Sequence, residues 1–133
     1  MLDHLTLVVT DYERSKAFYL AALAPIGYEE VMELSREHIP QLPVEKTIGI
    51  GARGKPSLWL RPSDDGVTPT HIAFRTKDRT LVDAFHTAAL KAGGVDNGEP
   101  GVRPHYHANY YGAFVLDPDG YNIEVVCHEP VVG

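Results

Sequence analysis

Two histidines and one glutamate are the residues of this chain best suited to chemistry, because each belongs to a strand-like stretch. His4 and His71 each begin a run rich in β-branched and apolar residues, and Glu124 lies in the middle of the alternating run 121–127. A carboxylate at that position needs a partner or a metal, since burying it alone is costly. Imidazole nitrogen and carboxylate oxygen together suit divalent transition metals. The three residues therefore predict an open site for a divalent ion, namely Fe, Mn, Zn, Ni or Co.

An internal repeat relates the two histidines. When the chain is shifted by 67 residues, which is 71 minus 4, His4 falls on His71 and positions 4–27 give 8 identities in 24 aligned pairs. Such self-similarity, occurring only twice, indicates pseudo-symmetry. We predict two βαβββ modules, residues 1–61 and 70–133, joined by the polar linker 62–69 within a single domain, 1–133.

Hydrophobic periodicity and turn residues place the elements that must position the ligands. Asp11 and Asp78 are each expected to cap the start of a helix. The turn Asp117-Pro118-Asp119-Gly120 is expected to join the last two strands. The expected strands are 4–9, 28–34, 47–50, 57–60, 71–75, 113–116 and 121–127, the second helix is 80–92, and the loops include 35–43 and 98–109.

Strand alternation places the three candidate ligands on faces turned away from the helices. Leu5 and Leu7 form the apolar face beside His4, and Ile123 and Val125 form the apolar face beside Glu124. We therefore expect an α+β fold in which curved sheets, with helices outside, surround a metal-binding cavity. The serine at position 57 stands where the repeat would put the counterpart of Glu124, so three ligands are expected and not four.

Composition and charge exclude several classes of function. The formal net charge is −6, which argues against nucleic acid and against anionic membrane surfaces as partners. No apolar run approaches the ~20 residues of a membrane span. The first residues lack the features of a signal peptide. The only cysteine, Cys127, cannot form an internal disulfide, and we expect a cytoplasmic protein.

Other residues are candidates for binding substrate or moving protons. Arg75 lies on the face of His71, where it could bind an anionic group of a substrate or pair with a nearby acid. Trp59 could stack on an aromatic ligand or belong to the core. Tyr106 is our choice for a catalytic hydroxyl in the segment 103–109, in which His105 and His107 are either acid–base groups or surface residues. The remaining histidines, treated as surface residues, are His38, His86 and His128.

Three segments carry a resemblance that covers the whole chain: DHLTLVVTDYERSKAFY, HIAFRTKDRTLVDAFHTAALKAGG and YYGAFVLDPDGYNIEVV. They resemble the vicinal oxygen chelate superfamily, which includes glyoxalase I, extradiol dioxygenases, fosfomycin-resistance enzymes and bleomycin-binding proteins. The resemblance implies that His4, His71 and Glu124 hold a divalent metal. A fourth ligand of the glyoxalase I type is missing at Ser57, which favours a three-ligand site.

The resemblance also implies a function and a partner. The leading expectation is a metal-dependent enzyme for a small substrate with vicinal oxygens, either a glyoxalase-type lyase or isomerase or an extradiol-type dioxygenase. In that reading Arg75 and Tyr106 bind substrate and move protons. The alternative is a metal-independent small-molecule binding or sequestration protein of the bleomycin-resistance type. A homodimer is expected, and the cavity either closes within one chain or forms by exchange of modules between two chains.

Overall fold

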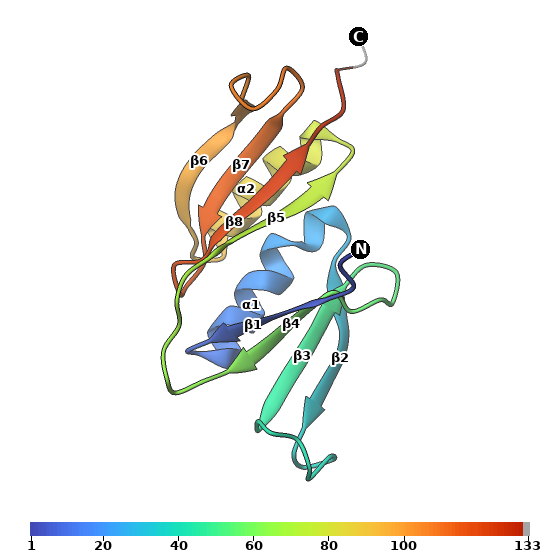
Figure 1. Cartoon of the computed structure of the whole chain (residues 1–133), viewed down its shortest axis with the longest axis vertical. Helices are drawn as coiled ribbons and strands as arrows, with labels where there is room; N and C mark the ends of the chain where they lie inside the picture. The colour runs from blue at the N-terminus through green and yellow to red at the C-terminus, as the bar shows by residue number, and fades with distance from the viewer. Residues whose placement is uncertain (132–133) are drawn as a thin grey trace.

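The first half of the chain forms a mixed sheet with one helix on its apolar face (Figure 1). A computed structural model describes residues 1–131. The strand order is β1-β4-β3-β2, in which β1 and β4 are parallel and the other pairs are antiparallel. The elements are β1 (Leu5–Val9), α1 (Tyr12–Ala22), the 3-10 turn η1 (Ala24–Ile26), β2 (Glu29–Ser35), β3 (Lys46–Gly51) and β4 (Leu58–Pro62).

The second half repeats the same topology with the order β5-β8-β7-β6. Its parallel pair is β5 and β8, which corresponds to β1 and β4 of the first half. The elements are β5 (His71–Thr76), α2 (Arg79–Lys91), β6 (Val95–Val102), β7 (Tyr111–Leu116) and β8 (Asn122–Cys127). The expected α+β fold of two repeated modules is confirmed, and within residues 1–131 the two sheets do not join into a closed barrel.

Both helices begin at the aspartates that the sequence predicts. The Asp11 carboxylate accepts a hydrogen bond from the Arg14 backbone N–H, and the Asp78 carboxylate accepts one from the Thr80 N–H. These bonds satisfy backbone donors that a helix start leaves free. Neither helix among residues 1–131 is long and apolar enough to cross a membrane.

One hydrophobic core joins the two modules. α1 contacts α2, α1 also contacts β4, and α2 contacts β6, β7 and β8. Fully buried apolar side chains of both sheets belong to one cluster with residues of these helices, for example Leu60 and Val9 in the first module and Val115 and Ile123 in the second. The opposite face of each sheet is therefore left for polar residues.

The strand β6 corrects the prediction that 98–109 is a loop, because it extends from Val95 to Val102. It lies at the edge of its sheet and pairs only with β7, with breaks in register at Asp96/Gly98 and Gly98/Gly101. Glycine, proline and asparagine rarely form strands, and edge strands tolerate them. The local sequence therefore resembles a loop, and its strand form depends on pairing with β7.

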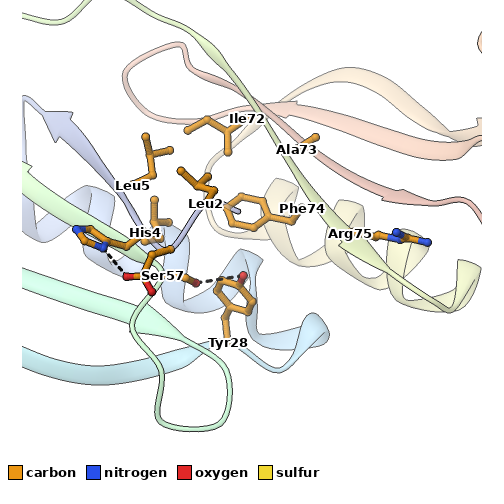
Figure 2. Close-up of a pocket in the computed structure, with 11 residues that line it drawn as sticks. Leu2, His4, Leu5, Tyr28, Ser57, Ile72, Ala73, Phe74 and Arg75 are labelled. Carbon is orange, nitrogen blue, oxygen red and sulfur yellow. Dashed lines mark hydrogen bonds and ion pairs between the residues drawn. The ribbon is translucent and has the colours of Figure 1, made fainter.

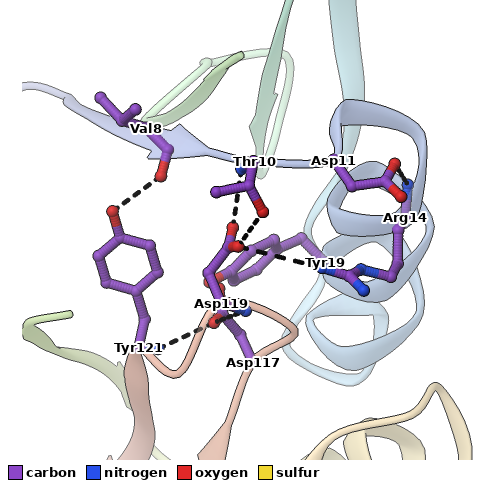
Figure 3. Close-up of polar contacts among 8 residues, drawn as sticks. All are labelled: Val8, Thr10, Asp11, Arg14, Tyr19, Asp117, Asp119 and Tyr121. Carbon is purple, nitrogen blue, oxygen red and sulfur yellow. Dashed lines mark hydrogen bonds and ion pairs between the residues drawn. The ribbon is translucent and has the colours of Figure 1, made fainter. Parts of the chain in front are cut away.

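The turn Asp117–Gly120 connects β7 to β8, as predicted, and also fastens the second module to the first. The buried Asp117 carboxylate accepts hydrogen bonds from the backbone N–H groups of Asp119 and Tyr121, at 2.8 and 2.9 Å. It also accepts a bond from the hydroxyl of Tyr19, which lies on α1 and is 0% exposed (Figure 3). A side chain of the second module thus satisfies a buried hydroxyl of the first.

Two neighbouring residues of this turn complete the contact between modules. The Asp119 carboxylate accepts bonds from the backbone N–H and the hydroxyl of Thr10, and Arg14 lies 4.0 Å away. The Tyr121 hydroxyl donates to the Val8 carbonyl oxygen at 2.7 Å. We call the contacts of Asp117, Asp119 and Tyr121 with the first module the module latch.

We expect Gly51→Ala to destabilise the protein by about 3 kcal/mol or more, the upper part of the range for overpacking. A Cβ at this position would lie 1.8 Å from the Lys55 carbonyl oxygen, which is backbone and cannot move alone. Gly54→Ala is the control, because it has no atom within 4 Å and only its φ of +74° is unfavourable, at about 1–2 kcal/mol. Urea unfolding measures both, and equal losses would contradict the clash.

Candidate metal and substrate site

The candidate site is built around Glu124, at the centre of β8. Its neighbours in the strand, Ile123 and Val125, point into the core, so the carboxylate lies on the free face of the sheet. Ala73 of β5 and Phe114 of β7 flank it in register. Glu124 is nevertheless only 1% exposed. A carboxylate buried to this degree requires polar partners.

Two side chains are those partners. His71 Nε2 lies 2.8 Å from Glu124 Oε1, and the Tyr110 hydroxyl donates a hydrogen bond to Oε2. Gly112 makes room for this arrangement, because a Cβ there would lie 3.2 Å from Oε2 and 3.3 Å from the Tyr110 ring. The free face of the second sheet therefore holds a carboxylate with an imidazole on one oxygen and a phenol on the other.

The Tyr110 hydroxyl keeps its proton and acts as a hydrogen-bond donor over the whole physiological pH range. Burial raises the pKa of Tyr110 well above its ordinary value, and the hydrogen bond to the Glu124 carboxylate raises it further. Both effects disfavour the phenolate. Tyr110 therefore orients Glu124 and does not compete with it as a charged group. Sequence reasoning chose Tyr106 for the catalytic hydroxyl instead.

His4 lies just before β1, on the first sheet, and does not contact the His71–Glu124 pair. Its Nδ1 is 2.7 Å from a carboxylate oxygen of the neighbouring Asp3, and its ring points away from Phe74 and Arg75 (Figure 2). Among residues 1–131 no group of three His, Cys, Asp or Glu side chains is placed to hold one metal ion. A single chain thus brings two of the three predicted ligands together and leaves the third on the other module.

A cavity of about 230 Å³ lies where the segment before β1 meets β5 (Figure 2). Its lining includes His4 and Arg75. The Arg75 guanidinium is 3.5 Å from the Glu129 carboxylate, and its side chain is 64% exposed. Both uses considered for Arg75, at a cavity and beside an acid, are therefore compatible with its position. Ser57 also lines this cavity and donates to the Tyr28 hydroxyl at 3.3 Å. The structure corrects its expected equivalence with Glu124. Trp59 pairs with the residue two after His4, as Glu124 pairs with the residue two after His71, so Trp59 and not Ser57 occupies the position equivalent to Glu124.

The segment 103–109 carries Tyr106 at the surface. Tyr106 is 58% exposed, and its ring lies 4.8 Å from that of Tyr110. His107 Nε2 is 2.8 Å from His128 Nδ1, and His105 stacks on Tyr106. The aromatic cluster therefore covers Tyr110, through which it adjoins Glu124.

One histidine treated as a surface residue is buried. His86 on α2 is 9% exposed, and its Nε2 lies 2.9 Å from the Asp96 carboxylate of β6. The hydrogen bond to His86 is the main cause that lowers the pKa of Asp96. The prediction was wrong because its partner lies on the strand that the sequence pattern did not reveal.

The donor set fits a divalent transition metal in part. Imidazole nitrogen and carboxylate oxygen are suitable ligands, and the buried Glu124 carries the charge that would offset a cation. The Tyr110 hydroxyl supports the carboxylate as an outer partner, as is common around metal ligands. Two ligands in contact on one sheet need a third donor from elsewhere to complete a triad.

Comparisons with known proteins agree with this architecture. The family model described as the Glyoxalase/Bleomycin resistance protein/Dioxygenase superfamily matches residues 1–125. No curated protein matches the chain. A solved glyoxalase/bleomycin resistance protein from Albidiferax ferrireducens is 25% identical with a TM-score of 0.71, and the match covers 96% of this chain and 98% of that one.

Two further structures extend the comparison. A glyoxalase I mutant from Zea mays is 25% identical with a TM-score of 0.70, and the match covers 94% of this chain but 46% of that longer chain. A glyoxylase/bleomycin resistance protein/dioxygenase domain from Frankia is 19% identical with a TM-score of 0.73, covering 97% and 98% of the two chains, and this likeness concerns the fold alone.

Proposed function

Because the chain belongs to the glyoxalase/bleomycin resistance protein/dioxygenase superfamily, we propose that it is a divalent-metal-dependent enzyme for a small substrate with two adjacent oxygen atoms. The observation that carries the proposal is the buried contact of Glu124 with His71 and Tyr110. A purely structural carboxylate would be stabilised more by a permanently charged side chain, and among residues 1–131 no lysine or arginine forms an ion pair with Glu124.

The roles follow from the positions of the side chains. His71, Glu124 and His4 would hold the cation, which when bound acts as a Lewis acid on the adjacent oxygens of the substrate. Tyr110 donates to Glu124 and holds the carboxylate in one orientation. Arg75 binds an anionic group of the substrate, and Tyr106 moves a proton at the exposed side. Lyase or isomerase chemistry and ring-cleaving oxygenation both use this arrangement.

We propose further that the protein acts as a homodimer in which each metal site combines the modules of two subunits. His4 lies on the free face of the first sheet, and His71 and Glu124 lie on the free face of the second. One chain alone therefore does not bring the three proposed metal ligands together. In a dimer with two-fold symmetry, His4 of one subunit would lie beside Glu124 of the partner subunit, and the symmetry would produce two such sites. The buried thiol of Cys127, the only cysteine, supports a cytoplasmic location.

A subunit-mixing experiment tests this arrangement. His4→Ala and Glu124→Ala are each expected to lose bound metal. When the two variants are unfolded together, refolded and dialysed against Zn(II), each heterodimer has one site with both changes and one site with neither. Metal binding should therefore return to about a quarter of the parent value per chain after random exchange, because half the dimers then carry one intact site in two. Metal is measured by mass spectrometry.

A second pair of variants is the matched control. His71→Ala and Glu124→Ala affect ligands of the same module, so no heterodimer of the two regains an intact site and metal should stay absent. Recovery in neither mixture, with heterodimers verified by two different tags, would overturn the shared site. A folded parent that takes up no metal would overturn the enzyme proposal in favour of a metal-independent binding protein.

A further inference from the structure

We propose that the free face of the first sheet is a binding site for a planar aromatic carboxylate, with its ring on Trp59 and its carboxylate on Arg61. The inference deepens the proposed function and rests on it for the role of His4, which lies at the edge of the same cavity. The contacts of the ligand's ring with Trp59 and of its carboxylate with Arg61 depend only on the first module.

Trp59 forms a flat platform on the sheet. It lies on β4 directly opposite Gly49 of β3, between Leu58 and Leu60, which both point into the core. A Cβ at Gly49 would lie 2.9 and 3.0 Å from two carbons of the indole ring. The glycine thus allows the ring to lie against the backbone of β3, and the other side of the half-buried ring faces the cavity. Aromatic side chains in such positions stack on planar ligands.

Arg61 supplies a positive charge on the same face. It follows Trp59 by two residues, so both side chains leave the sheet on one side. Arg61 is exposed and forms an ion pair with no carboxylate among residues 1–131, whereas Arg75 lies 3.5 Å from Glu129. No aspartate or glutamate of the described part of the chain, residues 1–131, lines the cavity. In a protein with a net charge of −6, this local charge favours an anion.

The loop segment that contains Leu42 and Pro43 also lines the cavity, and hydrogen bonds within the chain hold it in place. Leu42 and Pro43 stand over the face of the sheet, and the Arg36 guanidinium donates to their carbonyl oxygens at 2.9 and 2.8 Å. These apolar residues line the same cavity as the indole, so a ring bound on Trp59 would have further apolar groups beside it. The cavity volume of about 370 Å³ lies in the range of roughly 300–1,000 Å³ that small-molecule sites occupy.

The occupant follows from these contacts. A planar ring suits the space between Trp59 and Leu42, and a carboxylate matches the two parallel N–H donors of an arginine. Thr6 and Thr47 also line the cavity. The Thr47 hydroxyl already donates to the Leu60 carbonyl oxygen. An organic ligand with a positive charge would be repelled by Arg61, and among residues 1–131 no acid lines the cavity to offset that repulsion.

Trp59 is the only tryptophan of the chain, so its indole N–H gives a single signal that reports on this site. The experiment titrates benzoate into EDTA-treated protein and follows this signal in proton–nitrogen correlation spectra. Benzoate should shift it saturably. Benzamide, which lacks the charge, should bind about tenfold more weakly. Cyclohexanecarboxylate, which lacks the aromatic ring, should bind about three- to tenfold more weakly.

Arg61→Gln should lower the affinity for benzoate about tenfold, to that of benzamide, and leave the affinity for benzamide unchanged. Arg53→Gln is the matched control, because Arg53 is exposed in the β3–β4 turn and does not line the cavity, so benzoate binding should be that of the parent. An indole signal that benzoate does not shift overturns the inference. The inference is also overturned if Arg61→Gln dissociates into monomers but binds benzoate as the parent does, because Arg61 would then belong to a subunit contact.

Removing the metal separates this inference from the proposed function. If benzoate shifts the indole signal while the parent takes up no metal, the binding site stands and the enzyme proposal fails. If the parent takes up metal but benzoate leaves the signal unchanged, the enzyme proposal stands and the aromatic carboxylate site fails.

Discussion

Glu124→Ala should weaken metal binding on the order of a hundredfold or more, because changing an outer partner of a metal ligand already costs about 10–100-fold. The parent is expected to retain close to one divalent ion per chain after dialysis. The variant should retain almost none, since it lacks the buried carboxylate that lies 2.8 Å from His71 Nε2. Metal analysis of untagged protein, loaded in turn with Fe(II), Mn(II), Ni(II) and Zn(II), measures the loss.

Thermal unfolding provides an independent readout of the same change. A metal that binds only the folded state stabilises it by about 2.7 kcal/mol when its free concentration is 100 times the dissociation constant. The parent should gain this stability on adding Zn(II), and Glu124→Ala should not. Glu37→Ala is the control, because Glu37 is an exposed loop carboxylate. If Glu124→Ala keeps the parent's metal content, Glu124 is not a ligand.

Asp117→Ala should destabilise the folded protein by about 3 kcal/mol or more. The change leaves three donors without their acceptor, namely the Tyr19 hydroxyl and the backbone N–H groups of Asp119 and Tyr121, and each buried unsatisfied group costs about 1–3 kcal/mol. Urea unfolding measures the loss. Asp64→Ala, in the exposed segment between the modules, should stay within about 0.5 kcal/mol of the parent.

Asp117→Asn tests the charge of the module latch separately. Burial raises the pKa of the Asp117 carboxyl above its ordinary value, and the bonds from Tyr19 and the two N–H groups only partly oppose this. A raised pKa in the folded state adds stability below the unfolded-state pKa, and this stability is lost as the pH rises through the folded-state pKa. The asparagine variant does not titrate, so its stability relative to the parent should improve from acid to neutral pH. A constant difference would contradict the raised pKa.

Sequence reasoning succeeded where the signal is local or repeated. The aspartate caps at positions 11 and 78 and the turn after Leu116 depend on a few adjacent residues, and the structure confirms them. Alternation also placed Glu124 on the face opposite Ile123 and Val125, since side-chain direction in a strand has a period of two.

The remaining features depend on contacts between distant segments. The strand β6 forms by pairing with β7, and the burial of His86 depends on Asp96 of that strand. The choice between Tyr106 and Tyr110 required the path of the segment 103–109, because both tyrosines have the same local chemistry. Whether His4 could reach Glu124 within one chain depended on how the two sheets are placed by the module latch.

The identical strand order of the two sheets has an evolutionary meaning. It is the arrangement that duplication and fusion of a gene for one module would leave. Once both copies are in one polypeptide, selection can act on each separately. Here the later copy has a carboxylate at position 124, whereas the earlier copy has Trp59 in the equivalent position and Arg61 two residues further along the same face. Under the two proposals above, the later copy would supply His71 and Glu124 to the ion, and the earlier copy would supply His4 and the surface that selects the substrate.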